Sequence, residues 1–474
     1  MTSDKSMTPL TCFTAYDIRG RLGSDLNEDI VHRIARAFAQ VLDARRIVIG
    51  RDCRATSLAL ANAVTDGLLA AGVQVIDLGL AGTEEMYFAT THLDACGGIE
   101  ITASHNPIDF NGMKLVGRGS APIDPMTTMP TIRALAESGL FQPSRPGGSM
   151  TGAEDTQAAY VDRVLSFVDV PALRPLRILV NAGNGAAGPT FDAIAAALSA
   201  RGAPLDFVRL HHDPDGSFPN GIPNPLLPEN QPVTANAVIK ANADFGVAWD
   251  GDFDRCFFFD HEGRFVPGEY VVGLLARVFL AKEPEATIVH DPRVVWNTQA
   301  VVVAAGGRAH ATRTGHAYFK QALRDTGAVY GGEMSAHHYF RDFMACDSGM
   351  IPWLLVAELI GRTGKSLASL LAEARAAFPS SGEINFRVAD PADAIARVEA
   401  ALAAQAITID RLDGLSLSFA DWRLNLRSSN TEPLLRLNVE TRGDEAGLIA
   451  RVGDVSRLVS IRNLEPAPTR QSLA

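Results

Sequence analysis

Three aspartates, Asp250, Asp252 and Asp254, stand at alternate positions in the stretch DGDFDR. The stretch directly follows an apolar run over residues 245–249, which is typical of a strand. At an effective dielectric near 20, two carboxylates about 4 Å apart repel by roughly 4 kcal/mol, so three converging carboxylates need a cation. Oxygen ligands in this number favour Mg²⁺ or Mn²⁺ over zinc. The stretch therefore predicts a divalent-metal site.

Two other readings of this stretch are a solvated acidic turn and a calcium loop of the D-x-D-x-D type. The calcium loop requires a bidentate glutamate downstream, which is missing at the required spacing, and bulky Phe253 stands where such a loop needs flexibility. Three carboxylates leave an octahedral Mg²⁺ short of ligands, and phosphate oxygens commonly complete the set. A phosphorylated partner is therefore expected.

A serine that could carry a phosphoryl group lies in the stretch TASHNP at residues 102–107. Ser104 follows a predicted strand over residues 98–102 and is flanked by His105, and Lys114 follows shortly after. A serine beside a histidine is by itself usually only part of a turn. The predicted metal site is what makes Ser104 a candidate nucleophile.

Two further polar stretches could bind a phosphorylated sugar. RSSNTEP at residues 427–433 offers a guanidinium, hydroxyls and an amide, the donors that a dianionic phosphate needs, although a plain polar hairpin has the same composition. GEMSAHH at residues 332–338 offers a carboxylate and a hydroxyl suited to sugar hydroxyls, and His337 could equally be a structural surface histidine.

The elements that must position these residues alternate between helices and strands. Ile30, Ile34, Phe38 and Val41 have helical spacing, and the pattern recurs in three successive units that each end a strand at a polar loop. Ligands of such sheets bind at the carboxyl ends of the strands. The predicted strands are 46–49, 73–78, 98–102, 177–180, 205–210, 245–249 and 287–290, and the predicted helices are 58–71, 190–200, 233–243 and 270–280.

The last hundred residues have a different pattern. Apolar β-runs over 384–388, 415–419, 424–426 and 435–439 precede a helix that begins near Glu445, which indicates a smaller α+β domain. Earlier in the chain, NAGNG at 181–185 lacks the full glycine spacing of a dinucleotide-binding fingerprint and is interpreted as a tight strand-to-helix turn.

Composition narrows the class of protein. A chain of 474 residues is longer than one hydrophobic core usually organises, so several domains are expected. Its net charge of −11 disfavours nucleic acid as a partner. No apolar run is long enough to cross a membrane, and the first residues carry no export signal. Five scattered cysteines argue against a disulfide framework and a zinc site, so we expect a cytoplasmic location. The sequence carries no signal for an oligomeric state.

The stretches TASHNP, DGDFDR, GEMSAHHYF and RSSNTEP occur in that order and resemble the four motifs of the α-D-phosphohexomutase family. The resemblance spans nearly the whole chain and is greatest to the bacterial phosphomannomutase/phosphoglucomutase branch. It implies three related α/β domains with mixed sheets and a C-terminal α+β, TATA-binding-protein-like domain around a central cleft. The expected domains are residues 1–150, 151–262, 263–376 and 377–474, with a hinge near residues 378–382.

The resemblance also implies a role for each motif. Ser104 would carry the phosphoryl group and, through its phosphate, share a Mg²⁺ ion with Asp250, Asp252 and Asp254. Lys114, Arg19 and His316 would be the candidates for proton transfer. The residues expected to bind substrate are Tyr16, His105, Arg255, Arg293, Glu333, Ser335, His337, Arg427, Ser429, Asn430 and Thr431.

Two stretches depart from the family pattern. Phe253 stands where many relatives carry glycine, and residues 82–85, GTEE, replace a turn that often contains proline. We expect neither stretch to contact a metal ligand.

The predicted reaction interconverts mannose 1-phosphate and mannose 6-phosphate through phosphoserine, with hexose 1,6-bisphosphate as intermediate and activator. Family members of this kind supply GDP-mannose. Three alternatives remain: a relative that prefers glucose phosphates, a metal-dependent sugar-phosphate phosphatase, and a non-catalytic sugar-phosphate sensor. Amino sugars are less expected, because Met334 stands where the glucosamine-specific relatives differ.

Overall fold

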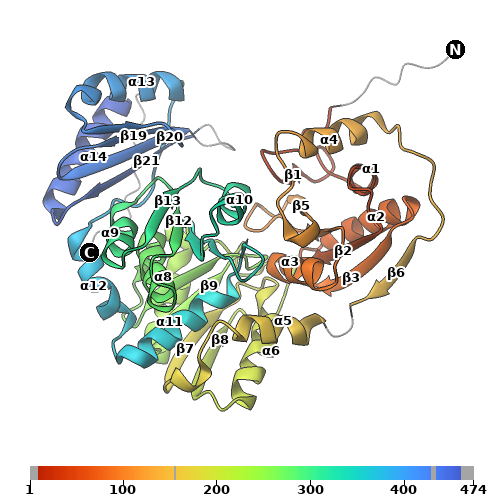
Figure 1. Ribbon diagram of the computed structural model, residues 1–474, viewed down its shortest axis with the longest axis horizontal. Helices are drawn as coiled ribbons and strands as arrows, with labels where there is room; N and C mark the ends of the chain where they lie inside the picture. Colours follow the sequence, from red (N-terminus) through yellow and green to blue (C-terminus); the bar gives the residue numbers. More distant parts are fainter. Residues whose placement is uncertain (1–8, 154–155, 429–433, 461–474) are drawn as a thin grey trace. The chain divides into compact units, whose positions relative to one another are not determined.

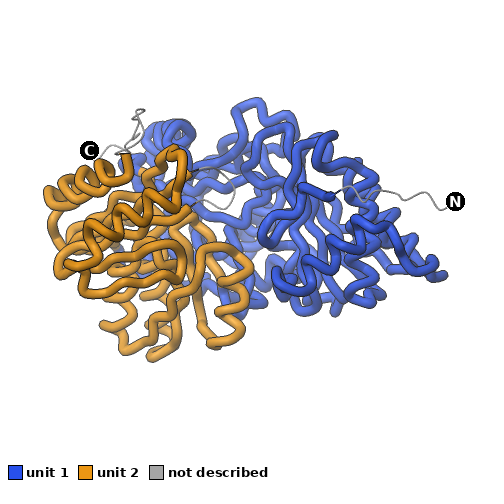
Figure 2. The backbone as a smooth tube through the Cα atoms, turned by 90° about the horizontal axis from the view of Figure 1, so that it is seen from above, with its two compact units in different colours: residues 1–264, 340–364 blue, residues 265–339, 365–474 orange. Residues whose placement is uncertain are grey.

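The computed structural model describes residues 9–153, 156–428 and 434–460. The chain forms two compact units, which Figure 2 colours separately. Unit 1 comprises Met1–Arg264 and Phe340–Gly364, and unit 2 comprises Phe265–Tyr339 and Lys365–Ala474. Figure 1 labels the helices and strands of both units.

The N-terminal sheet of unit 1 is mixed, with the strand order β1-β5-β4-β2-β3-β6. Strand β2 pairs in parallel with β3 and β4, whereas β5 pairs antiparallel with β4 and β1. Helices α1, α2 and α4 contribute apolar residues to the core of this part. The bounds are β1 Ile18–Arg21, α1 Glu28–Val41, β2 Arg46–Arg51, α2 Ser57–Ala70, β3 Gln74–Leu80, α3 Thr83–His92, β4 Gly97–Ile101, β5 Phe110–Gly117, α4 Thr128–Ser138 and β6 Ser149–Gly152.

Four strands of the second sheet belong to unit 1 and have the order β10-β9-β7-β8, with β7 parallel to β8 and β9 and with β9 antiparallel to β10. Helix α11 packs here although it comes a hundred residues later, and Trp353 on it lies 5.7 Å from the ring of Phe191 on α6. The bounds are α5 Thr156–Leu165, β7 Leu176–Asn181, α6 Ala187–Ala200, β8 Leu205–Leu210, α7 Gln231–Ala241, β9 Phe245–Trp249, β10 Cys256–Asp260, β16 Cys346–Asp347 and α11 Met350–Thr363.

In the first sheet of unit 2, β12 lies between β13 and β14 and pairs in parallel with both. The loops that follow β12 and β14 carry Arg293 and Glu333, so both residues lie at the carboxyl ends of neighbouring strands. The bounds are β11 Phe265–Val266, α8 Gly268–Lys282, β12 Thr287–His290, α9 Trp296–Ala304, β13 Arg308–Ala311, α10 His316–Thr326, β14 Tyr330–Gly332, β15 His338–Phe340 and α12 Leu367–Ala377.

The C-terminal sheet of unit 2 is antiparallel throughout, with the order β17-β21-β20-β19-β18. Side chains of its strands alternate between an apolar and a polar face. On β20, Leu424 and Leu426 join the apolar core with α13 and α14, whereas Arg423 and Asn425 lie on the opposite face. That opposite face is polar and still buried: Arg423 is 5% exposed and Asn425 is fully buried. The bounds are β17 Ile384–Arg387, α13 Pro391–Leu402, β18 Thr408–Asp410, β19 Leu415–Ser418, β20 Trp422–Ser428, β21 Leu434–Thr441 and α14 Glu445–Ser460.

The predicted fold class is confirmed, since three mixed α/β sheets precede an antiparallel C-terminal sheet. Predicted strand 287–290 is β12 with the same bounds, and predicted helix 58–71 is α2 shifted by one residue. Residues 181–185 lead from β7 to α6, as interpreted. Residues 82–85, which replace a turn of the family pattern, start a helix: α3 begins at Thr83, Gly82 is its N-cap residue and the Glu85 carboxylate accepts the Gly82 N–H. Helix α11 was not predicted, because it is buried and apolar on nearly all sides and its sequence therefore has no clear helical period.

None of the helices in the described part of the chain is both long and apolar enough to cross a membrane. All five cysteines are free thiols.

His338 on β15 is a fully buried histidine with a direct partner. Its Nδ1 atom lies 2.7 Å from the Tyr330 hydroxyl of β14, and the two rings stack with centroids 6.1 Å apart. Burial lowers the pKa of His338 from 6.5 to about 3, and neighbouring His337 adds to the effect. The folded protein therefore keeps this imidazole neutral in a pH range where the unfolded chain protonates it.

We predict that wild-type stability decreases as the pH falls from 6.5 toward 3, because protons bind to this histidine only in the unfolded state. At pH 5 the loss from His338 alone amounts to about 2 kcal/mol. His338→Gln stays neutral and should flatten the pH dependence of the free energy of unfolding, measured by urea denaturation between pH 5 and 7. Exposed His261 provides the control, because His261→Gln should keep the wild-type slope. An unchanged slope in His338→Gln would contradict the prediction.

Candidate functional site

Ser104 lies directly after β4, at the carboxyl end of a buried strand. Its backbone is in the left-handed region at φ 48°, and its N–H donates to the Thr102 hydroxyl at 2.8 Å. Buried Arg54 holds this loop, because its guanidinium donates to four carbonyl oxygens at 2.6–3.1 Å, of residues Ser104, Asn106, Pro107 and Phe110. The serine is thus presented by a loop that one cation fixes in place.

The three aspartates follow β9 and are fully buried, with one carboxylate oxygen from each lying within 4.8 Å of the others. The Oδ1 atoms of Asp250 and Asp252 accept no hydrogen bond from any described residue. Buried carboxylate oxygens without donors are costly unless a cation binds them. This donor set fits a metal ion that prefers oxygen ligands.

Ser104 and the aspartates belong to one site. The Ser104 hydroxyl donates to Asp250 Oδ2 at 2.7 Å, although 146 residues separate them in sequence. Gly251 makes this approach possible, because a Cβ atom there would lie 2.6 Å from the Ser104 carbonyl oxygen.

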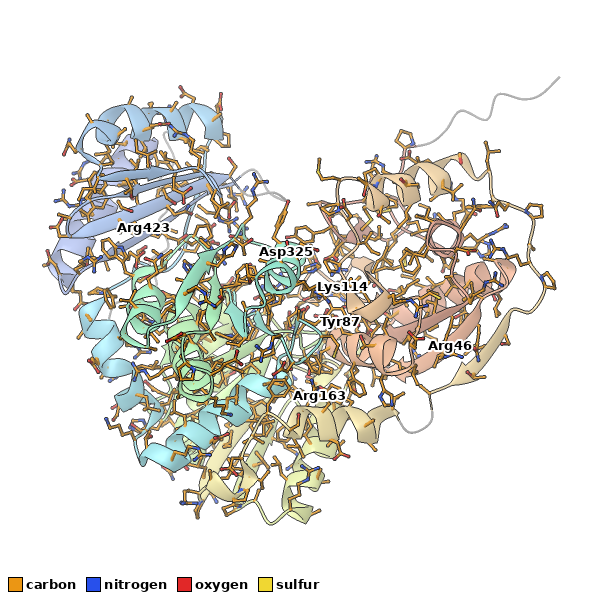
Figure 3. All side chains as sticks on the ribbon, viewed as in Figure 1. Arg46, Tyr87, Lys114, Arg163, Asp325 and Arg423 are labelled. Atoms are coloured by element: carbon orange, nitrogen blue, oxygen red, sulfur yellow. The ribbon has the colours of Figure 1, made fainter. Side chains whose placement is uncertain are left out.

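Lys114 of β5, labelled in Figure 3, supplies the cluster with positive charge. Its ammonium group donates to Asp252 Oδ2 at 2.7 Å and to Asp254 Oδ2, and its side chain is 5% exposed. Burial alone would lower the pKa of Lys114, but the two aspartates outweigh burial and raise it above its ordinary value. Lys114 in turn holds the pKa of Asp252 below its ordinary value in spite of burial. The lysine is therefore charged.

Three other predicted residues of unit 1 contact Ser104, Asp250 or the backbone of the serine loop. His105 Nδ1 lies 3.0 Å from the Ser104 hydroxyl, and burial together with the Arg255 charge lowers the pKa of His105 to about 4. Arg255 Nε lies 3.5 Å from Asp250 Oδ2, and Arg19 of β1 donates to the Thr102 carbonyl. Tyr16 lies on the segment before β1.

Residues 332–338, which are predicted to bind sugar hydroxyls and are here called the sugar loop, lie in unit 2 at and after the end of β14. Glu333 is 1% exposed and both of its oxygens are engaged, Oε1 by the Gly315 N–H at 2.9 Å and Oε2 by the Tyr339 hydroxyl at 2.6 Å. His316, the first residue of α10, directly follows Gly315. Half-buried Ser335 and buried His337 complete the loop, whose backbone closes through Glu333 N–H to the His337 carbonyl at 2.9 Å.

Unit 2 contains a cluster that is mainly positive, in contrast to the aspartate cluster of unit 1. Arg293, Arg427 and Arg436 converge on the Glu383 carboxylate at 3.4, 3.2 and 3.4 Å. Burial would raise the pKa of Glu383, but the three guanidinium groups lower it below its ordinary value. Arg293 also pairs with Asp291 at 2.8 Å and lies 4.0 Å from Glu333. The sugar loop and Arg427 are therefore linked through Arg293 and Glu383.

The C-terminal sheet is fixed to this cluster by a neighbouring ion pair. Arg423, also labelled in Figure 3, donates to the Arg293 carbonyl at 2.8 Å and pairs with Glu440 at 3.1 Å. Glu440 accepts the N–H groups of Val295 and Trp296 at the start of α9. Ser429, Asn430 and Thr431, also predicted to bind phosphate, lie outside the described residues.

One expectation about this site is wrong. Residues 82–85 were not expected to contact a metal ligand, yet the Thr83 hydroxyl donates to Asp252 Oδ2 at 2.7 Å. No local pattern indicates this contact, because 169 residues separate Thr83 from Asp252. The roles of Arg54 and Glu383 were not predicted either. In the sequence each looks like an ordinary surface charge, because its partners lie far away along the chain.

Comparisons with known proteins identify the family. Models of phosphoglucomutase/phosphomannomutase match four consecutive segments: α/β/α domain I over residues 11–142, domain II over 158–263, domain III over 267–378 and the C-terminal domain over 383–452. The limits predicted for the domains from the sequence stay a prediction.

Similar proteins agree with these matches. The chain is 58% identical over 455 residues to a phosphomannomutase of Salmonella montevideo, covering 96% of this chain and all of the relative. It is 54% identical over 450 residues to a protein of Xanthomonas campestris named phosphohexose mutases, covering 95% of this chain and 99% of that one. A crystal structure of a phosphoglucomutase/phosphomannomutase family protein from Burkholderia thailandensis superposes with a TM-score of 0.86 at 31% identity, covering 98% of this chain and 100% of that chain.

These findings confirm the resemblance and the class of enzyme inferred from the four motifs. The chain belongs to the phosphoglucomutase/phosphomannomutase family.

Proposed function

We propose that this protein is a phosphomannomutase that interconverts mannose 1-phosphate and mannose 6-phosphate, with glucose phosphates as further substrates. The observation that carries the proposal is the hydrogen bond from the Ser104 hydroxyl to Asp250 within the buried three-aspartate loop. High identity to proteins named phosphomannomutase supports mannose, and the name of the Xanthomonas relative supports a wider range of hexoses.

In the proposed reaction, phosphorylated Ser104 transfers its phosphoryl group to the free hydroxyl of a hexose monophosphate. The bond between phosphorus and Ser104 Oγ breaks, a bond to the sugar oxygen forms, and the product is a hexose 1,6-bisphosphate. After the intermediate reverses its orientation, its other phosphoryl group returns to Ser104 and the isomeric monophosphate leaves. Added hexose 1,6-bisphosphate would activate the enzyme by phosphorylating Ser104.

Residues of unit 1 would manage the charge of the transferred group. A Mg²⁺ ion held by Asp250, Asp252, Asp254 and the Ser104 phosphate would neutralise charge on the phosphoryl oxygens. Lys114 is charged and adds a second cation to this cluster. His105, Arg255 and Arg19 lie around Ser104, where they can orient the phosphoryl group, and Lys114, Arg19 and His316 remain the candidates for proton transfer.

Residues of unit 2 would bind the rest of the substrate. Glu333, Ser335 and His337 are proposed to hold sugar hydroxyls, and Tyr16 of unit 1 to assist. Arg427 and Arg293 are proposed to hold the phosphate that does not react, together with Ser429, Asn430 and Thr431. Convergence of three guanidinium groups on the Glu383 carboxylate supports an anion site of this kind.

Phosphoryl transfer through Ser104 predicts that Ser104→Ala lowers kcat for mannose 1-phosphate by at least about a thousandfold, because the nucleophile is lost. The assay compares kcat/KM for mannose 1-phosphate and glucose 1-phosphate with Mg²⁺ and catalytic hexose 1,6-bisphosphate. Exposed Ser166 gives a matched control, and Ser166→Ala should retain wild-type activity. Removal of Mg²⁺ by a chelator should abolish turnover.

Release of inorganic phosphate without isomerised sugar would contradict the mutase and favour the phosphatase. A higher kcat/KM for glucose 1-phosphate would leave the mechanism intact and contradict the mannose preference. Binding of hexose phosphate without turnover of any kind would favour the sensor.

The proposed anion site predicts that Glu383→Gln destabilises the protein by on the order of 3 kcal/mol, because three largely buried guanidinium groups lose the carboxylate that they share. Inorganic phosphate should restore much of the loss by binding in place of the carboxylate. The measurement is Tm by calorimetry with and without phosphate.

Glu399→Gln is the control, because Glu399 pairs with Arg411 on the surface and such pairs contribute less than about 1 kcal/mol. If phosphate raises the Tm of Glu383→Gln by no more than that of Glu399→Gln, phosphate does not take the place of the Glu383 carboxylate.

A further inference from the structure

The loop that carries the aspartates adopts a conformation that its own sequence does not favour. Phe253 has a φ of 47°, in the left-handed region that bulky side chains rarely occupy. Its side chain is fully buried, so the ring has contacts that compensate for this backbone. Those contacts identify what holds the loop in place.

One support is Thr83, the first residue of α3. Its hydroxyl donates to Asp252 Oδ2 at 2.7 Å, and its N–H donates to the Asp252 carbonyl oxygen at 3.2 Å. Thr83 is fully buried, so both bonds form away from solvent. A single residue therefore fixes the side chain and the backbone of Asp252.

These contacts orient the Asp252 carboxylate. Its Oδ2 atom accepts from both Thr83 and Lys114, each at 2.7 Å, whereas its Oδ1 atom has no donor among the described residues. The carboxylate is thus held with one oxygen fully occupied and the other available as a ligand. Second-sphere donors of this type fix the orientation of metal ligands.

The other support is the contact between the Phe253 ring and Gly82. A Cβ atom on Gly82 would lie 2.1 and 2.2 Å from Cε1 and Cζ of that ring. Gly82 itself has a φ of −106°, which any residue can adopt. Glycine is therefore required here for space and not for backbone conformation, because the ring occupies the volume of a side chain.

Helix α3 can serve as a rigid support because its own start is anchored. The Glu84 carboxylate accepts the hydroxyls of Tyr160 on α5 and Ser348 as well as the Gly349 and Met350 N–H groups at the start of α11. The Glu85 carboxylate accepts the Gly82 N–H at 3.0 Å. Two consecutive acidic residues thus fix the segment that presents Gly82 and Thr83.

We propose that Gly82 and Thr83 are positioning residues that set the metal affinity of the aspartate loop. Thr83 orients Asp252, and Gly82 receives the Phe253 ring that keeps the loop in its left-handed conformation. The inference rests on the proposed metal site. Both residues are buried, so they act by orienting the aspartate loop and not by contact with substrate.

The test measures binding of Mn²⁺ to the full-length protein without substrate, by calorimetry and electron paramagnetic resonance. Thr83→Val removes the hydroxyl at nearly constant volume and should raise the Kd by about tenfold or more. Thr83→Ser keeps the hydroxyl and should stay within about threefold of wild type. Thr90 on the same helix is an equally buried control, because its hydroxyl donates to the Met86 carbonyl, and Thr90→Val should bind Mn²⁺ as wild type does.

A double variant tests the contact between Gly82 and Phe253. Gly82→Ala should weaken Mn²⁺ binding, since the added methyl group displaces the ring. Phe253→Gly removes the ring and tolerates the positive φ, so Gly82→Ala added to Phe253→Gly should have no further effect. Circular dichroism and thermal unfolding establish that each variant is folded.

The outcomes separate the two proposals. If wild-type protein binds no Mn²⁺, the proposed metal site is wrong and this inference falls with it. If wild type binds Mn²⁺ but Thr83→Val binds it equally well, or if both threonine-to-valine variants lose affinity alike, the positioning role is wrong while the metal site stands. Equal effects of Gly82→Ala with and without the Phe253 ring would overturn the role of Gly82.

Discussion

Three fully buried carboxylates within one loop are the constraint on which the rest of unit 1 depends. Negative charges this close together in a protein interior are unstable unless cations and hydrogen-bond donors balance them. Lys114 supplies a positive charge in direct contact with both Asp252 and Asp254, and the hydroxyls of Ser104 and Thr83 supply donors. These groups leave the Oδ1 atoms of Asp250 and Asp252 without a donor, and a divalent cation would bind those two oxygens.

Unit 2 contains a charge cluster of the opposite kind, in which positive groups surround one negative group. Three guanidinium groups surround the single Glu383 carboxylate, and burial of the polar face of the C-terminal sheet keeps them together. In each unit an internal residue of opposite charge balances the cluster that a ligand is proposed to bind. Such a residue keeps the site folded in the absence of ligand, and the ligand must then compete with it or add to it.

Local backbone and side-chain choices in both units follow from this arrangement of charge. Gly251 lets the aspartate loop approach Ser104, and Arg54 collects four carbonyl oxygens so that the serine loop keeps its shape. In unit 2, Glu333 is held by Gly315 and Tyr339, so the sugar loop is fixed before any substrate arrives. Preorganisation of this kind reduces the cost of ordering the site during binding and catalysis.

Much of this could be predicted from the sequence, because the governing patterns are local. Hydrophobic periodicity predicted several strands and helices, among them β12 and α2, and the spacing of Asp250, Asp252 and Asp254 after an apolar strand predicted the acidic cluster. The four motifs in order predicted the family, which the comparisons confirm. Tertiary structure alone decided which distant residues meet. The bond from Thr83 to Asp252, the convergence on Glu383 and the grip of Arg54 each depend on the folded chain bringing together residues far apart in sequence, and no local pattern encodes such contacts.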